Sequence, residues 1–215
     1  VNTVVGKDAD FISALLPGTV CSAEFYFGGI FMRHKKLLAL CECAIFTAMA
    51  LALSYLKIPI GLEFGGFGGS IDLVMIPLIL CAIRWGCGWG LGTGLVFGTL
   101  KFFLAGGTAV NWQSMLLDYS IAYMCVGLAG LLRGKSKTAW LAALIGCFGR
   151  FVIHFISGVT VYAQYMPEEF MGMTMTSPVT YSILYNGTYM LPNTILAVII
   201  CALLMKPAAK LPSAE

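Results

Sequence analysis

Six runs of apolar residues, each almost free of charged side chains, follow one another along this chain. We expect each to cross a membrane, and they cover approximately residues 37–56, 70–83, 88–104, 113–132, 139–161 and 178–205. In a bilayer only α-helices and closed β-barrels satisfy every backbone hydrogen bond, and these runs lack the alternation of a barrel strand. The sequence therefore predicts an all-α fold, a bundle of six transmembrane helices.

The composition agrees with a membrane protein. Charged residues make up 11% of the chain, whereas a soluble domain has about 25%. We expect residues 32–210 to form one integral membrane domain in contact with lipid, followed by a short C-terminal tail, residues 211–215. Basic residues are not interleaved with aromatic ones, so nothing indicates binding to nucleic acid.

The distribution of basic residues predicts the orientation. Two of the basic residues that flank the spans are expected on one side, Lys57 and Lys101, and nine on the other: Arg33, Lys35, Lys36, Arg84, Arg133, Lys135, Lys137, Lys206 and Lys210. Cytoplasmic loops carry the excess of Lys and Arg. Both termini are therefore expected in the cytoplasm.

Residues 1–31 differ from the rest of the chain. They have neither the basic start nor the long apolar run of a signal peptide. A glycine pair can be encoded by a GGAGG-like ribosome-binding sequence, and Gly28-Gly29 lies two codons upstream of Met32. We hypothesise that this extension is not native and that translation starts at Met32. An N-terminal tail is the alternative, and the intact mass of the native protein distinguishes the two.

Polar and aromatic side chains form a stripe on the fifth span. Arg150, His154, Gly158 and Tyr162 follow at four-residue spacing, and this spacing places them on one face of a helix. Polar groups at membrane depth are costly and usually face a cavity or a partner. We interpret the stripe as one wall of a pocket for a polar, partly aromatic ligand.

An acidic residue, Asp118, lies next to Tyr119 within the fourth span. An isolated carboxylate in an apolar environment is costly, so we expect it to meet a cation. That cation is either Arg150, in a structural ion pair, or a positively charged ligand. The residues alone leave both possibilities open.

The sixth span carries tyrosines at positions 181, 185 and 189, which share one helix face. Asn186 lies about 140° from Tyr181 on an ideal helix. Both could still reach one pocket if the helix begins irregularly near Pro178 or lies between two neighbours. An asparagine offers a donor and an acceptor together, which suits an aminopyrimidine-like edge.

Two helices carry small residues at every fourth position. Ala44, Ala48 and Ala52 lie on the first span, and glycines 90, 94 and 98 lie on the third. Such spacing lets another helix approach closely. We expect the glycines to pack within the bundle, whereas the alanines serve either internal packing or docking to another membrane subunit.

No catalytic or metal-binding motif is found. The sequence has no H-E-x-x-H, G-x-S-x-G or Walker motif, and its eight cysteines are scattered without a C-x-x-C pair. Glu42 and Lys101 are interpreted as isolated. We therefore expect neither an enzyme nor a bound metal or cofactor.

Three segments resemble one known family. LLDYSIAYMCVGLAGL, GRFVIHFISGVTVYAQY and SPVTYSILYNGTYMLPN, together with the six-span pattern, are similar to the thiamine-specific S components of energy-coupling factor transporters. These are substrate-binding subunits of bacterial cell membranes. The resemblance implies that thiamine is bound from outside and delivered with a transmembrane T component and two ATP-binding-cassette ATPases. The alanine pair, Ala44 and Ala48, matches the face with which S components dock to the T component.

The resemblance also implies roles for single residues. Asp118 would be the counter-ion of the thiazolium ring, at a position where some relatives have Glu. His154 and Tyr162 would flank the ligand rings, and some relatives have Trp at the second position. Gly158 would allow close approach. The aminopyrimidine would be bound by Tyr181 and Asn186, with Tyr119 and Arg150 completing the pocket.

Three other functions are considered. An S component for another vitamin or a thiamine precursor would share the fold, although an anionic vitamin would favour an unpaired Arg150 and no nearby carboxylate. A membrane enzyme would need a metal site or a nucleophile beside a base. A structural subunit without a ligand leaves the charged and aromatic residues of the fifth and sixth spans unexplained.

Overall fold

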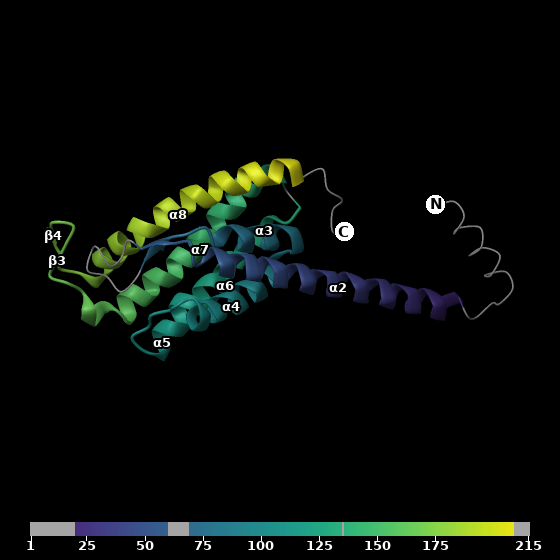
Figure 1. Cartoon of the computed structure of the whole chain (residues 1–215), viewed down its shortest axis with the longest axis horizontal. Helices are drawn as coiled ribbons and strands as arrows, with labels where there is room; N and C mark the ends of the chain where they lie inside the picture. Colours follow the sequence, from purple (N-terminus) through teal and green to yellow (C-terminus); the bar gives the residue numbers. More distant parts are fainter. Residues whose placement is uncertain (1–19, 60–68, 135, 209–215) are drawn as a thin grey trace. The chain divides into compact units, whose positions relative to one another are not determined.

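The computed structural model describes residues 20–59, 69–134 and 136–208. The tail predicted at residues 211–215 and most of the N-terminal extension therefore lie outside the described residues. The chain divides into two compact units, residues 1–41 and 42–215. The second unit holds the C-terminal part of the first described helix and all other elements (Figure 1).

Six helical segments correspond to the six predicted spans. They are α2 (Val20–Leu53), α3 (Met75–Trp85), α4 (Cys87–Leu104), a composite helix (Trp112–Leu132), α7 (Ala139–Thr160) and α8 (Pro178–Ala208). Among the described residues, five helices are long and apolar enough to cross a bilayer, and α3 is shorter, with 11 residues. The predicted all-α, six-helix membrane fold is confirmed. The orientation of the termini stays a prediction.

The composite helix changes its hydrogen-bond pattern along its length. Its parts are α5 (Trp112–Met115), the π-helical η1 (Leu116–Ile121), α6 (Ala122–Val126) and the 3-10 segment η2 (Gly127–Leu132). The Asn111 side chain caps the start by accepting the Ser114 N–H at 2.8 Å. The Ala122 N–H reaches back five residues to the Leu117 carbonyl, which is the π-helical pattern.

Short elements link the helices. Strand β1 (Ile58–Pro59) pairs with β2 (Ser70–Ile71), and β3 (Glu169–Phe170) pairs with β4 (Met173–Thr174), both antiparallel. Two 3-10 turns complete the links, η3 (Ser136–Thr138) and η4 (Ala163–Tyr165).

The boundaries of two helices differ from the prediction. Helix α3 starts at Met75 instead of residue 70, because Ser70 and Ile71 are held in β2. The Asp72 carboxylate then accepts the Val74 N–H at 3.3 Å, a local turn that competes with helix. Helix α2 begins at Val20 instead of residue 37. A helix can continue beyond the apolar run from which the span was predicted.

Close helix packing surrounds the glycines of α4. A Cβ added at Gly94 would lie 2.1 Å from the Tyr123 carbonyl oxygen, and one at Gly98 would lie 2.2 Å from that of Tyr119. Helix α4 therefore packs backbone to backbone against η1 and α6, and the predicted internal role of these glycines is confirmed. Helix α7 packs against α6 and also runs along α8 (Figure 1).

Replacing Gly94 by Ala is expected to destabilise the protein by about 1–3 kcal/mol, because the added methyl group meets fixed backbone atoms. Gly92→Ala on the same helix is the control, since a Cβ there would meet nothing within 4 Å. Thermal unfolding in detergent measures both. Equal melting temperatures for the two variants would contradict the packing account.

Helices α2 and α3 are joined by an ion pair. Both Arg84 and the Trp85 indole N–H donate to the Glu42 carboxylate, the indole at 2.8 Å. The interpretation of Glu42 as isolated is therefore wrong. Its cation lies 42 positions later in the chain, which the sequence spacing does not reveal.

Candidate ligand-binding site

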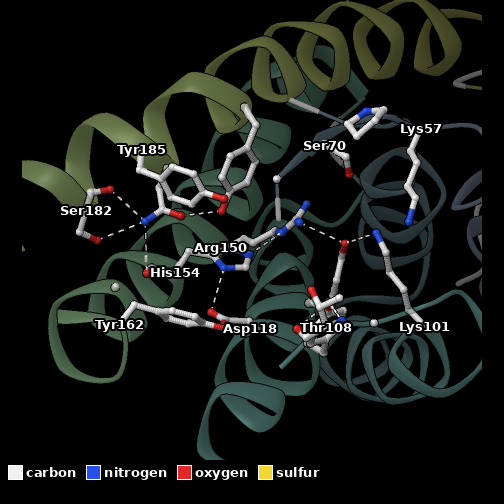
Figure 2. Close-up of a pocket in the computed structure, with 18 of the residues that line it drawn as sticks. Lys57, Ser70, Lys101, Thr108, Asp118, Arg150, His154, Tyr162, Ser182 and Tyr185 are labelled. Atoms are coloured by element: carbon white, nitrogen blue, oxygen red, sulfur yellow. Dashed lines mark hydrogen bonds and ion pairs between the residues drawn. The ribbon is translucent and has the colours of Figure 1, made fainter. Parts of the chain in front are cut away.

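One end of the helix bundle contains a cavity of about 630 Å³, within the roughly 300–1,000 Å³ typical of small-molecule sites. Its walls come from α4, η1, α6, α7 and α8, and its rim from the residues around β1–β2 and the turn after α4 (Figure 2). All eight residues predicted to bind substrate line this cavity: Asp118, Tyr119, Arg150, His154, Gly158, Tyr162, Tyr181 and Asn186. Their roles in binding stay predictions.

The carboxylate of Asp118 contacts a histidine of the facing helix. Its Oδ1 lies 3.1 Å from Nδ1 of His154, and the two side chains are only 15% and 10% exposed (Figure 2). Within the described residues no ion pair joins Arg150 to a carboxylate. The structural Asp118–Arg150 pair, one of the two possibilities left open by the sequence, is therefore not formed.

The guanidinium of Arg150 is buried behind the histidine. Its Nε donates to His154 Nε2 at 3.2 Å, and its Nη2 donates to the Tyr123 hydroxyl at 3.0 Å. A guanidinium has only donors, so Nε2 must accept. The ring hydrogen of a neutral His154 then lies on Nδ1, where it is donated to Asp118.

A buried ion pair between Lys101 and Asp72 adjoins the cavity, and it was not predicted from the sequence. Nζ of Lys101 donates to Asp72 Oδ2 at 3.0 Å and to the Tyr123 hydroxyl at 2.6 Å, and Lys101 is 7% exposed. The interpretation of Lys101 as isolated is therefore wrong. A lysine inside an apolar span was itself a signal, since such a charge needs a partner.

Aromatic rings form the wall on α8. Tyr181 and Tyr185 are stacked, with ring centroids 5.7 Å apart, and Phe170 of β3 meets Tyr181 edge-on at 5.3 Å. The prediction that the α8 tyrosines share one face is confirmed. Opposite them, burial raises the pKa of the Tyr162 phenol to about 12, so this side chain stays a hydrogen-bond donor at neutral pH.

The side chain of Asn186 lies where α8 meets α7. Its Nδ2 donates to the Ser182 carbonyl at 2.9 Å, and its Oδ1 accepts from the Tyr189 hydroxyl at 2.5 Å. Helix α8 is α-helical from Pro178, so Asn186 and Tyr181 reach the cavity without an irregular start. A Cβ at Gly158 would lie 2.2 Å from Ser182 Oγ. The absence of a side chain at Gly158 therefore also permits the close contact between α7 and α8.

Tyr119, another predicted site residue, holds the turn after α4. The Tyr119 hydroxyl accepts the Thr108 N–H at 2.9 Å and lies 3.2 Å from the Thr108 carbonyl. Tyr119 thus fixes the rim of the cavity as well as lining it. No group of three or more His, Cys, Asp or Glu side chains that could hold a metal occurs in the part of the chain that the structure describes.

The cavity therefore combines three kinds of contact. It has a carboxylate at Asp118, stacked aromatic rings on α8 and an amide at Asn186. Aromatic faces and a carboxylate attract cations, and aromatic faces also stack with flat rings. This arrangement suits a flat, positively charged ligand with a hydrogen-bonding edge.

The known proteins to which this chain is similar are thiamine transporters. Residues 40–213 match the family described as thiamine transporter protein. The thiamine transporter ThiT of Bacillus subtilis is 32% identical over 198 residues, which cover 83% of this chain and 96% of the relative. ThiT of Lacticaseibacillus paracasei is 31% identical over 195 residues, covering 83% and 92%.

A solved structure of ThiT from Listeria monocytogenes superimposes with a TM-score of 0.71 at 28% identity, covering 83% of this chain and all of that one. The relatives are transporters, so the prediction that the chain is not an enzyme is confirmed. The predicted multi-pass membrane protein is confirmed as well. The chain belongs to the thiamine transporter protein family.

Proposed function

We propose that this chain is the thiamine-binding S component of an energy-coupling factor transporter in a bacterial cell membrane. It binds thiamine from outside the cell. It then delivers the vitamin across the membrane together with a T component and two ATP-binding-cassette ATPases. The family of the chain supports thiamine as the substrate.

The observation that carries the proposal is the carboxylate of Asp118 inside an aromatic cavity. Thiamine has a positively charged thiazolium ring, and taking this cation out of water is costly. Asp118 offsets that cost as counter-ion. Faces of His154 and Tyr162 add cation–π and stacking contacts, each cation–π contact being worth about 0.5–2 kcal/mol.

The second ring of thiamine is an aminopyrimidine. Asn186 can donate to and accept from its edge, and Tyr181 offers a ring face. The amide of Asn186 is hydrogen-bonded to Ser182 and Tyr189, so contacts within the protein hold it in place for this role. Arg150 and Tyr119 complete the pocket, and Gly158 lets the ligand approach the helix.

Uptake of labelled thiamine tests the whole proposal. Cells that lack their own thiamine transport are supplied with this chain, a T component and both ATPases. We expect accumulation of thiamine that requires all the subunits and ATP hydrolysis, whereas cells with this chain alone bind thiamine without accumulating it. Accumulation by this chain alone would contradict the proposal.

The docking surface for the T component is proposed on α2. Ala44 and Ala48 are exposed, whereas Cys43 and Thr47 on the same helix are buried. The alanine face is therefore free of the rest of the described bundle and small enough for a second helix to approach closely. This supports docking over internal packing.

Replacing Ala48 by Trp is expected to abolish co-purification with the T component and ATPases while thiamine binding stays within about threefold of wild type, because the bulky side chain blocks close helix approach. Val96→Trp on α4 is the control, since Val96 is also an exposed apolar residue. Affinity capture of the complex measures both. Retention of the T component by the Ala48 variant would refute this docking surface.

A further inference from the structure

Asp118 contacts one ring nitrogen of His154, Nδ1, and Arg150 contacts the other, Nε2. In the described part of the chain, no hydrogen bond or ion pair joins Asp118 to Arg150 directly. A guanidinium near a carboxylate normally forms a strong, often bidentate pair with it. Such a pair would neutralise the charge that a cationic ligand needs. The contacts of Arg150 therefore decide whether Asp118 is available.

Tyr123 of α6 provides the main contacts of that guanidinium. Its hydroxyl accepts from Arg150 Nη2 at 3.0 Å, and Cζ of Arg150 lies 4.2 Å from the centroid of its ring. One side chain thus offers both a hydrogen bond and a cation–π contact. Together they hold the guanidinium on the side of His154 that faces away from Asp118.

Tyr123 is itself fixed from several elements. It is 1% exposed, and the ring of Phe97 meets it edge-on at 4.8 Å. Nζ of Lys101 donates to its hydroxyl at 2.6 Å and to Asp72 at 3.0 Å. The Asp72 N–H in turn donates to the Asn193 side chain at 2.9 Å. These contacts come from α4, α8 and the residues after β2, so the phenol is held from several sides.

We propose that Tyr123 determines the preference of this site for a cation by holding Arg150 away from Asp118. Tyr123 acts through Arg150 as a positioning residue, and its effect is on the charge of the site. The inference rests on the proposed function, because it assumes that the cation is the thiazolium ring of thiamine. Lys101 and Asp72 support Tyr123 in this role.

The test compares two ligands by calorimetry. One is thiamine, and the other is an uncharged isostere in which a neutral aromatic ring replaces the thiazolium. In Tyr123→Leu the guanidinium loses both contacts and can pair with Asp118. We expect the affinity for thiamine to fall on the order of tenfold or more, while that for the neutral isostere changes by less than about threefold. Tyr123→Phe keeps the ring and is expected to lie between wild type and Tyr123→Leu.

A double-mutant cycle with Arg150→Met tests the route of the effect. If Tyr123 acts through Arg150, neither Tyr123 substitution lowers thiamine affinity further in the Arg150→Met background. Should Tyr123→Leu fail to fold, as judged by thermal unfolding, Tyr123→Phe carries the cycle alone.

Three results would overturn the inference. They are equal losses for the charged and the neutral ligand, losses that persist without Arg150, and unchanged thiamine affinity in both variants. A wild-type chain that does not bind thiamine would overturn the proposed function and this inference with it. The two failures are therefore distinguishable.

Discussion

Replacing Asp118 by Asn is expected to weaken thiamine binding by about 2–5 kcal/mol, that is, roughly 30-fold to several thousand-fold. Asparagine has the shape of aspartate and can still accept the hydrogen bond from His154. It lacks the negative charge, so the thiazolium cation would be buried without its counter-ion. Isothermal calorimetry on the purified variant measures the loss.

Two comparisons make this result specific. Glu168→Gln removes a carboxylate from an exposed residue outside the cavity and is expected to leave the affinity unchanged. The Asp118 variant is expected to stay folded, because asparagine keeps the shape of the side chain and its hydrogen bond to His154 survives. Unchanged thiamine affinity in the folded Asp118 variant would mean that the carboxylate is structural.

Replacing Lys101 by Met is expected to destabilise the protein by about 3–5 kcal/mol, because it leaves the Asp72 carboxylate buried without its cation. Asp72 is 4% exposed, and its side chain is held by the Val74 N–H and Ser70 in addition to Lys101. The carboxylate therefore cannot reach water without breaking the turn that begins α3. Thermal unfolding in detergent without ligand measures the change.

A second substitution is expected to reverse most of this loss. Asp72→Asn in the Lys101→Met background removes the unpaired charge and keeps an oxygen for the Val74 N–H. Lys57→Met is the control, because Lys57 lines the same cavity but is exposed, and it is expected to change stability by less than about 0.5 kcal/mol. A double variant as unstable as Lys101→Met would show that the charge is not the cause.

Much of the site could be predicted from spacing within single helices. The stripe from Arg150 to Gly158 needs only the helical period, and a charge or amide in an apolar run points to a cavity. Tyr162 lines the same cavity from just beyond the end of α7 at Thr160. The tyrosines of α8 share a face for the same reason. The six apolar runs likewise predicted the six helical segments and hence the fold.

Contacts between helices could not be predicted in this way. The partner of Asp118 is His154 rather than Arg150, and Asp118 lies in the π-helical segment Leu116–Ile121. Such a segment shifts the phase of the helix, and periodicity alone does not show it. For the same reason Tyr123 reads as an ordinary apolar residue of its span, although it contacts both buried cations.

The cavity is proposed to bind thiamine. Isothermal calorimetry of thiamine with the purified wild-type protein in detergent tests it most directly, since none of the four tryptophans lines the cavity and fluorescence quenching is a less certain reporter. We expect saturable binding at one site with nanomolar affinity. Absence of binding, or tighter binding of an anionic vitamin, would contradict it.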